Sequence, residues 1–350
     1  MEKKCKSTYL IGEIGQNHNG SFELAKQIID LAAMPVREKL FDLPVKGMDA
    51  VKFTKRDLTQ ELSASEMKKP YLSPNSFGKT YGEHRKALEL SDEQHFALFK
   101  YAKLKNLDFV ETLCSPSCLS LLKYFEPNKL KVASRDLTNL PLLEALAETK
   151  IPIILSTGMT GKQELDEALE VITRIHSKIS ILHCVSEYPT HPQHVNLRSL
   201  DYLLKNYGEY SIGYSDHTIG ISVPVAAVAK GAQIIEKHIT IDRSMKGTDQ
   251  KGSLGIDGVR RMVRDIRLME MALGREDIFI QDAVQAVRNK LERSLATNRT
   301  IMKGEIMLEE DIHLLSPGTG YKWNERFRII GKKTSQIIYK DEIILPGHIS

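Results

Sequence analysis

Two histidines follow short apolar runs in the middle of the chain. His217 lies in YSIGYSDHTIG and His238 in AQIIEKHITID. The segment between them, Ile221 to Gly231, reads ISVPVAAVAKG, an apolar run of helical character closed by a glycine. A strand, a helix and a strand in this order predict neighbouring parallel strands, so both imidazoles project from the carboxyl edge of one sheet. There they can share one divalent metal; alternatively, such polar residues only satisfy the local backbone.

Other polar residues with chemical potential also stand at or just beyond the ends of short apolar runs. Two lysines and several hydroxyls suit a phosphate, because each donates to an anionic oxygen. Two histidines and a carboxylate suit a divalent metal and acid–base work. Together they predict a metal-assisted enzyme acting on a phosphorylated, oxygen-rich metabolite. The set is Glu13, Lys52, Thr112, Lys131, Ser134, Ser156, Ser186, Tyr188, Ser215, His217 and His238.

Each of these residues also has a purely structural interpretation. A strand-end lysine is often a surface charge whose alkyl chain covers apolar neighbours. Ser156 and Thr157 could only cap the next helix. Glu13 could be a structural partner of Lys52. The functional interpretation depends on the joint pattern across most of the strand ends.

Eight apolar runs alternate with segments of helical spacing. This alternation predicts a parallel sheet, and eight units predict closure into a (β/α)8 TIM barrel, with an open doubly wound sheet as the alternative. The carboxyl ends of all eight strands would then share one pocket. The expected strands are 9–15, 49–53, 107–113, 130–133, 152–157, 179–184, and the two histidine strands. The expected helices are 21–34, 91–106, 140–149, 162–176, 197–207, 221–230 and 257–273.

The last part of the chain differs from the barrel pattern. Gly274 can end the last barrel helix, and a polar connector follows it. We therefore expect a barrel domain at 1–274, a linker at 275–290 and a small β-rich domain at 291–350. At this size the small domain is marginal alone and gains stability by docking.

Composition excludes several classes of protein. The 350 residues are 41% hydrophobic and 27% charged, with a net charge of +4. We expect no nucleic-acid partner, since no basic cluster is interleaved with aromatics. We expect no membrane association and a cytoplasmic location, because the chain has neither a signal-peptide h-region nor a run of about 18 apolar residues. Cys5, Cys114, Cys118 and Cys184 fit reduced thiols.

Motifs along most of the chain resemble the sialic acid (N-acylneuraminate) synthase family. They occur in the family's order and span residues 9–250, and the tail from ERSLATNRTIMKGEIM onwards resembles the family's antifreeze-like (SAF) domain. FGKTYGEH and KGTD look closer to the animal-type synthases, which take a 6-phosphorylated sugar. The motifs are IGEIGQNHNGS, VKF, FGKTYGEH, KVASRD, ILSTGM, LHCVSEYPT, IGYSDHTIG, EKHIT and KGTD.

The resemblance implies a PEP-dependent, C–C bond-forming transferase of sialic acid biosynthesis. Phosphoenolpyruvate (PEP) would condense with an N-acylmannosamine or its 6-phosphate to give a nine-carbon 2-keto acid and phosphate. His217 and His238 would hold Mn2+ or Mg2+, and Glu13 would position or deprotonate the attacking water. Tyr188, Asp136 and Asp249 match sugar-binding positions. PEP would be bound by Lys52, Thr112, Lys131, Ser134, Ser156, Ser186 and Ser215.

The chain departs from the family pattern at several positions. Arg135 replaces the usual glycine beside the PEP and sugar sites, where it could contact a phosphate or carboxylate or point to solvent. Thr54 and Ser186 stand where bacterial members have Gln and Asn. Ser316 is the nearest match to an arginine that reads the N-acyl group.

These departures concern the sugar substrate. Mannose 6-phosphate, which a Kdn-type synthase would use, is an alternative to an N-acylmannosamine, and another modified hexose is a further alternative. The family also implies a domain-swapped homodimer in which the small domain covers the partner's site. Lys303 or Lys322 could then replace the arginine, or the domain could be a structural lid.

A barrel without activity is disfavoured by the intact set of Glu13, the two lysines and the two histidines.

Overall fold

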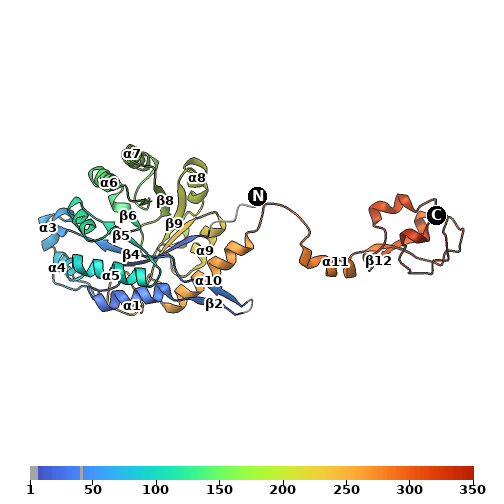
Figure 1. Cartoon of the computed structure of the whole chain (residues 1–350), viewed down its shortest axis with the longest axis horizontal. Helices are drawn as coiled ribbons and strands as arrows, with labels where there is room; N and C mark the ends of the chain where they lie inside the picture. The colour runs from blue at the N-terminus through green and yellow to red at the C-terminus, as the bar shows by residue number, and fades with distance from the viewer. Residues whose placement is uncertain (1–6, 40–41) are drawn as a thin grey trace. The chain divides into compact units, whose positions relative to one another are not determined.

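The computed structural model describes residues 7–39 and 42–350, so Cys5 lies outside the described residues. The chain divides into two compact units, one ending at Gly274 and one spanning Arg275–Ser350. The first unit is a closed barrel of parallel strands (Figure 1). Its strands are β1 (Tyr9–Gly15), β4 (Ala50–Lys55), β5 (Asp108–Leu113), β6 (Lys129–Val132), β7 (Ile153–Ser156), β8 (Ile179–Cys184), β9 (Ser211–Asp216) and β10 (Ile234–His238).

Closure of the sheet depends on β1. This strand pairs in parallel with β10 on one side and with β4 on the other. The predicted (β/α)8 barrel is therefore confirmed, and the open doubly wound alternative is wrong. Glu13 is in register with Lys52 of β4 and with His238 of β10, so the closing seam already aligns three candidate residues.

Helices form the outer layer of this unit (Figure 1). Serine side chains cap two of them: Ser21 accepts from the Leu24 N–H, and Ser91 forms a capping box with Gln94. The β5–β6 connection is instead a 3-10 segment, η1 (Pro116–Lys123). The helices are α1 (Phe22–Ala33), α5 (Asp92–Leu104), α6 (Leu140–Glu148), α7 (Lys162–Thr173), α8 (Ser199–Asn206), α9 (Ser222–Ala229) and α10 (Ile256–Ala272).

The stretch after β4, for which no helix was expected, contains further elements. They are α2 (Leu58–Glu61), α3 (Ala64–Lys68) and α4 (Tyr81–Ala87), the last of which begins with a Thr80–Glu83 capping box. A small antiparallel pair, β2 (Val36–Glu38) and β3 (Leu43–Val45), also precedes β4 and was not predicted. Short elements of this kind give too few periods for sequence patterns to reveal them.

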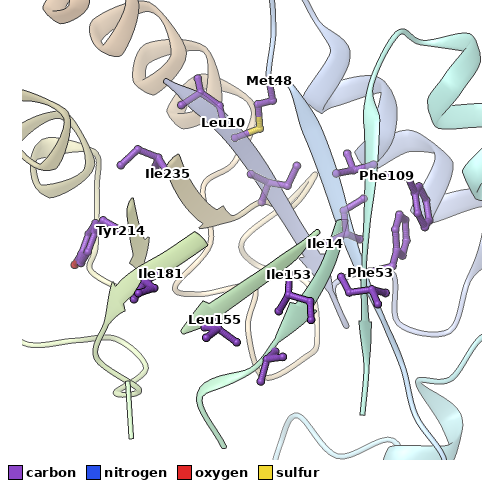
Figure 2. Close-up of a cluster of buried hydrophobic side chains, with 14 of the residues drawn as sticks. Leu10, Ile14, Met48, Phe53, Phe109, Ile153, Leu155, Ile181, Tyr214 and Ile235 are labelled. Atoms are coloured by element: carbon purple, nitrogen blue, oxygen red, sulfur yellow. The ribbon is translucent and has the colours of Figure 1, made fainter. Parts of the chain in front are cut away.

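The barrel wall has two apolar layers. Outward-facing strand residues such as Leu10, Phe109 and Ile181 pack in the layer between the sheet and the helices (Figure 2). A smaller inner cluster fills the barrel interior, with Tyr9 packed against it. It consists of Ile11, Ala50, Val110, Ile154, Leu182 and Ile234.

A polar site lies directly beyond this inner cluster along the same strands. Successive side chains alternate between the two faces of a strand, so the residue two positions further on also faces inward. Each member of the inner cluster is followed at that spacing by a residue that lines the carboxyl-end cavity: Glu13, Lys52, Thr112, Ser156, Cys184 and Glu236. The barrel is therefore apolar toward its amino end and polar toward its carboxyl end.

The second unit is small and has little regular sheet. After η4 (Asp282–Val284) and α11 (Gln285–Leu291), β11 (Ser294–Thr297) pairs with β12 (Ile312–Leu315) in antiparallel orientation. Other segments of this unit make single bridges, such as Ile301 with Ile338, and alternate with 3-10 turns η5 (Glu309–Asp311), η6 (Trp323–Arg328) and η7 (Pro346–His348). Its core is Leu295, Ile301, Met307, Ile312, Ile329, Ile338 and Ile344.

Across residues 7–39 and 42–350, no helix combines the length and the apolar character that crossing a membrane would need.

Candidate active site

A cavity of about 320 Å³ lies at the carboxyl end of the barrel. Residues from β1, β4, β5, β6, β7, β8, β9 and β10, or from the loops that follow them, contribute to its wall. It brings together most of the candidate residues: Glu13, Lys52, Thr112, Lys131, Ser134, Arg135, Ser156, Tyr188, Ser215, His217, His238 and Asp249.

Two candidate residues do not line this cavity. Ser186 lies beside its wall, because a Cβ added at Gly158 would be 2.5 Å from Ser186 Oγ and 2.8 Å from Ser134 Oγ. Asp136 accepts from Arg135 Nε at 3.3 Å and contributes to a neighbouring pocket with Glu61 and Asn139. Asp136 therefore holds a cavity residue and does not itself face this cavity.

Two buried carboxylates share one lysine at the base of the cavity. Lys52 Nζ is 2.5 Å from Glu13 Oε2 and 3.8 Å from Glu236 Oε1, and Ser215 Oγ donates to Glu236 Oε1 at 3.0 Å. Burial, reinforced by the charge of Glu236, raises the pKa of Glu13 to about 7 although Lys52 opposes the shift. Burial also acts to raise the pKa of Glu236, but the charges of Lys52 and Lys131 outweigh it and lower that pKa to about 2. Glu13 is thus the carboxyl able to exchange a proton near neutrality.

The second lysine lies among hydroxyl groups. Lys131 Nζ donates to Ser156 Oγ at 2.6 Å and to the Val132 carbonyl at 2.8 Å. Burial lowers the pKa of Lys131. Ser134 Oγ accepts from the Gly158 N–H at 3.0 Å, which fixes the hydroxyl against the turn after β7. Ammonium and hydroxyl donors arranged in this way suit phosphate or carboxylate oxygens.

The two histidines lie together on another wall of the cavity. Their ring centroids are 5.6 Å apart, and the Tyr188 ring lies 4.0 Å from that of His217. His217 Nδ1 is 2.8 Å from the Val185 carbonyl, to which it donates, so Nε2 is left as an acceptor. His238 is partly buried, its buried Nδ1 has no hydrogen-bond partner, and desolvation lowers its pKa. Imidazole nitrogens without a protein donor, with a carbonyl behind one ring, fit the ligands of a divalent metal.

A metal at this pair would have few protein ligands. Across the described residues, three or more His, Cys, Asp or Glu side chains nowhere form a ready-made metal cluster. Two histidine ligands would therefore leave several coordination positions to water or to substrate.

Sequence reasoning missed several residues of the cavity. Glu236 stands two positions before His238 on β10, and the alternation of strand side chains could have placed it inward. Arg56 stands four positions after Lys52, just beyond the end of β4. Arg85 lies on α4, far from any strand end, so no strand signal marks it. The missed cavity residues are Gly15, Gln16, Arg56, Tyr81, Arg85, Cys114, Ala133, Cys184 and Glu236.

The cysteines that the structure describes are free thiols. Cys114, Cys118 and Cys184 are buried and form no disulfide. Cys118 packs in the outer core layer, whereas Cys114 and Cys184 are part of the cavity wall.

A closed barrel with ionisable groups gathered at its carboxyl end is the architecture of the (β/α)8 enzymes. Within that class, residues 44–277 match the NeuB family and residues 292–350 match the SAF domain. The chain belongs to the NeuB family, which confirms the resemblance seen in its motifs, and it carries a SAF domain after the barrel.

Similar proteins cover nearly the whole chain. The N-acetylneuraminate-9-phosphate synthase of Homo sapiens is 32% identical over 338 residues, which cover 96% of this chain and 91% of that protein. The N,N'-diacetyllegionaminic acid synthase of Legionella pneumophila is 33% identical, with 97% and 94% covered. A solved structure of N-acetylneuraminic acid synthetase from Leptospira borgpetersenii, in complex with citrate, is 31% identical, covers 80% of this chain and 90% of that chain, and has a TM-score of 0.66.

Proposed function

We propose that this chain is a sugar-acid synthase that condenses PEP with an N-acylmannosamine or its 6-phosphate. The products would be a nine-carbon 2-keto acid and inorganic phosphate. The observation that carries this proposal is the joining, in one cavity, of two buried lysines with hydroxyl donors, Glu13 and the histidine pair. The names of the relatives support a synthase of this kind.

PEP carries a phosphate and a carboxylate on the same carbon, so it needs two sets of donors close together. Lys131, with Ser134 and Ser156, offers one set, and Lys52 with Thr112, 3.4 Å apart, offers the other. Ser215 and Ser186 lie close to these sets at the ends of β9 and β8. Most of these donors are buried, so their charges act in a medium of low polarity and are strong there.

The reaction itself balances with water as the only further reactant. The C3 carbon of PEP bonds to the aldehyde carbon of the open-chain sugar, and the aldehyde oxygen takes up a proton. Water then adds at C2, and the C2–O bond to phosphate breaks, leaving the keto group at C2. Glu13, with its pKa raised to about 7 by burial, can accept the proton of that water.

The histidine pair is the place for a divalent metal in this proposal. His217 and His238 would hold Mn2+ or Mg2+ through ring nitrogens. His217 has Nε2 available because its Nδ1 donates to a carbonyl, and His238 Nδ1 has no hydrogen-bond partner. A metal bound there supplies Lewis acidity at the aldehyde oxygen. Tyr188 and Asp249 line the same cavity and are proposed to orient the sugar.

Mannose 6-phosphate, which has no N-acyl group, remains a second candidate acceptor. The reason is that two side chains considered for the role of the N-acyl-reading arginine are already hydrogen-bonded within the small unit. Ser316 Oγ donates to the Leu291 carbonyl at 2.8 Å, and Lys322 Nζ is held by Glu292 at 3.0 Å and by the Gly318 carbonyl. Both groups are used inside their own unit, so neither is free to take the role of an arginine that reads an N-acyl group. We further propose a domain-swapped homodimer in which this unit covers the partner's cavity.

The test is sugar-dependent release of phosphate from PEP. Purified protein with Mn2+ would be assayed with N-acetylmannosamine, its 6-phosphate and mannose 6-phosphate in parallel. We expect turnover with at least one sugar, loss of turnover in EDTA and loss in His217→Ala. His176→Ala, on the outside of the barrel after α7, is the matched control and should keep activity. Phosphate release with none of the sugars would contradict the proposal.

A further inference from the structure

Three arginines stand together at the mouth of the cavity and are not used by the proposed PEP chemistry. Arg56 follows β4, Arg85 lies on α4, and Arg135 lies in η2 (Ser134–Asp136), which follows β6. All three line the same cavity as Lys52 and Lys131. Arg56 and Arg135 each stand four positions after one of these lysines on the same strand and loop. The cavity therefore has a lysine end within the barrel and an arginine end at its mouth.

Acidic residues hold two of these guanidinium groups. Glu61 lies 3.4 Å from Arg56 Nη1 and 2.6 Å from Arg135 Nη2. Arg56 is also 3.6 Å from Glu89, and Arg135 is 3.3 Å from Asp136. These contacts fix the two planar groups without using all of their donors.

Arg85 has no such partner. Within the described residues it forms no ion pair. With the Gln16 amide turned so that its oxygen faces the arginines, Arg85 Nη1 donates to that oxygen at 2.6 Å and Arg56 Nη2 donates to it at 2.9 Å. Burial and the charges of Arg56 and Arg135 lower the pKa of Arg85. The three guanidinium groups lie among three carboxylates, Glu61, Glu89 and Asp136, but none of these pairs with Arg85. The Arg85 guanidinium is therefore available to an anion in the cavity.

We propose that Arg56, Arg85 and Arg135 form a second anion subsite that binds the phosphate ester of the sugar acceptor. This inference rests on the proposed function, because it assigns the acceptor that the PEP reaction would use. Four residues of chain span at most about 13 Å, so the backbone positions of the lysines and of Arg56 and Arg135 lie no farther apart than this, within the scale of one open-chain hexose phosphate. The aldehyde would then lie near Glu13 and the histidines while the phosphate is held at the mouth. The acceptor class is a hexose 6-phosphate, whichever group stands at C2.

The experiment compares each sugar with and without its phosphate. Initial rates would be measured at saturating PEP and Mn2+ with N-acetylmannosamine, mannose and the 6-phosphate of each. The wild-type chain should favour the phosphorylated form by about 100-fold or more in kcat/KM. Arg85→Gln should reduce that ratio by about 10- to 100-fold, chiefly through the KM for the sugar phosphate, as expected for one lost charge-assisted contact.

Two further variants keep this test interpretable. Arg135→Gln changes a side chain that is 38% exposed and should reduce the same ratio even if Arg85→Gln folds poorly. Arg174→Gln, an exposed residue after α7 paired with Glu170, is the control and should leave the ratio unchanged.

The outcomes separate this inference from the function on which it rests. Equal use of phosphorylated and free sugars by the wild-type chain, or an unchanged ratio in both arginine variants, would overturn the subsite and leave the synthase standing. Absence of turnover with all four sugars would overturn both.

Discussion

Glu13 shows how one residue acquires its chemistry from its position in the barrel. It faces inward two positions after Ile11, it is in register with Lys52, and only 4% of it is exposed. Burial therefore raises its pKa, while Lys52 keeps it anchored. The Glu13–Lys52 contact expected from the sequence is present, and it also places the carboxyl in the cavity, where the proposed function uses it.

The raised pKa of Glu13 has a consequence for stability. Between the ordinary value of 4.5 and about 7, the folded chain holds a proton that the unfolded chain releases, so native stability falls as pH rises through this window. Glu13→Gln cannot lose that proton. We predict that the stability of Glu13→Gln relative to wild type increases by up to about 3 kcal/mol between pH 5 and pH 8. Urea unfolding in EDTA checks this; a difference that stays constant with pH would contradict it.

Lys131 offers a matched test of the proposed PEP site on one strand. Lys131→Met should lower kcat/KM for PEP by about 100-fold or more, because its buried ammonium is a charged donor. Lys129→Met is the control: it lies two positions earlier on β6, with Nζ 5.4 Å from the Tyr9 ring. Steady-state kinetics distinguish the two, and an equal loss in both variants would argue against a PEP-binding role for Lys131.

The sequence predicted most of the cavity residues, Arg135 among them, but not Arg56 or Arg85. Lys52, Lys131, His217 and His238 stand at strand ends, and a barrel must collect such residues. Arg85 stands on a helix in a stretch without strand periodicity. Its place at the mouth follows only from how α4 packs, which is a tertiary property.

At the scale of elements, the turn after β7 joins three strand ends. Gly158 lets Ser186, Ser134 and Cys184 approach closely, since a Cβ there would come within 2.9 Å of each. Ser186 follows β8, Ser134 follows β6, and Cys184 is the last residue of β8. The turn therefore sets the spacing of the hydroxyl donors. Any side chain at position 158 would collide with these three neighbours, so the position requires glycine. The motif ILSTGM in the sequence does not reveal this reason.

Replacing this glycine should therefore disturb the site more than the fold. Gly158→Ala is predicted to reduce kcat/KM for PEP by about 100-fold, since small misplacements of positioning groups have effects of this size. Gly161→Ala is the control, because its Cβ would meet only the flexible tip of Glu164 at 3.3 Å. Kinetics and thermal unfolding of both variants check this, and full activity in Gly158→Ala would show that the turn does not set the donor spacing.

The elements themselves were largely predictable from sequence. All eight barrel strands were located, because they are apolar runs bounded by polar ends, and β1 and β8 have the bounds that the sequence indicated. The short helices α2, α3 and α4 were not found, nor was the β2–β3 pair. The small unit was expected to be β-rich; in the described residues its regular strands are β11 and β12, and further pairing is by single bridges around the core.

At the scale of the whole molecule, the proposed domain swap can be tested by complementation. Full-length Lys131→Met has a disabled barrel and an intact small unit, and a chain ending at Gly274 has the opposite defect. If each site uses the barrel of one chain and the small unit of its partner, mixing the two inactive proteins should restore activity. Continued inactivity of the mixture, with mixed dimers shown to form, would contradict the swap.

The most direct test of the central claim follows the bridging oxygen of PEP. PEP labelled with 18O between C2 and phosphorus would be incubated with Mn2+ and the preferred sugar, and the phosphate released would be analysed by mass spectrometry. The account predicts sugar-dependent release of phosphate that carries the label, because water adds at C2 and the C2–O bond breaks. Label retained in the organic product, or phosphate release independent of sugar, would contradict it.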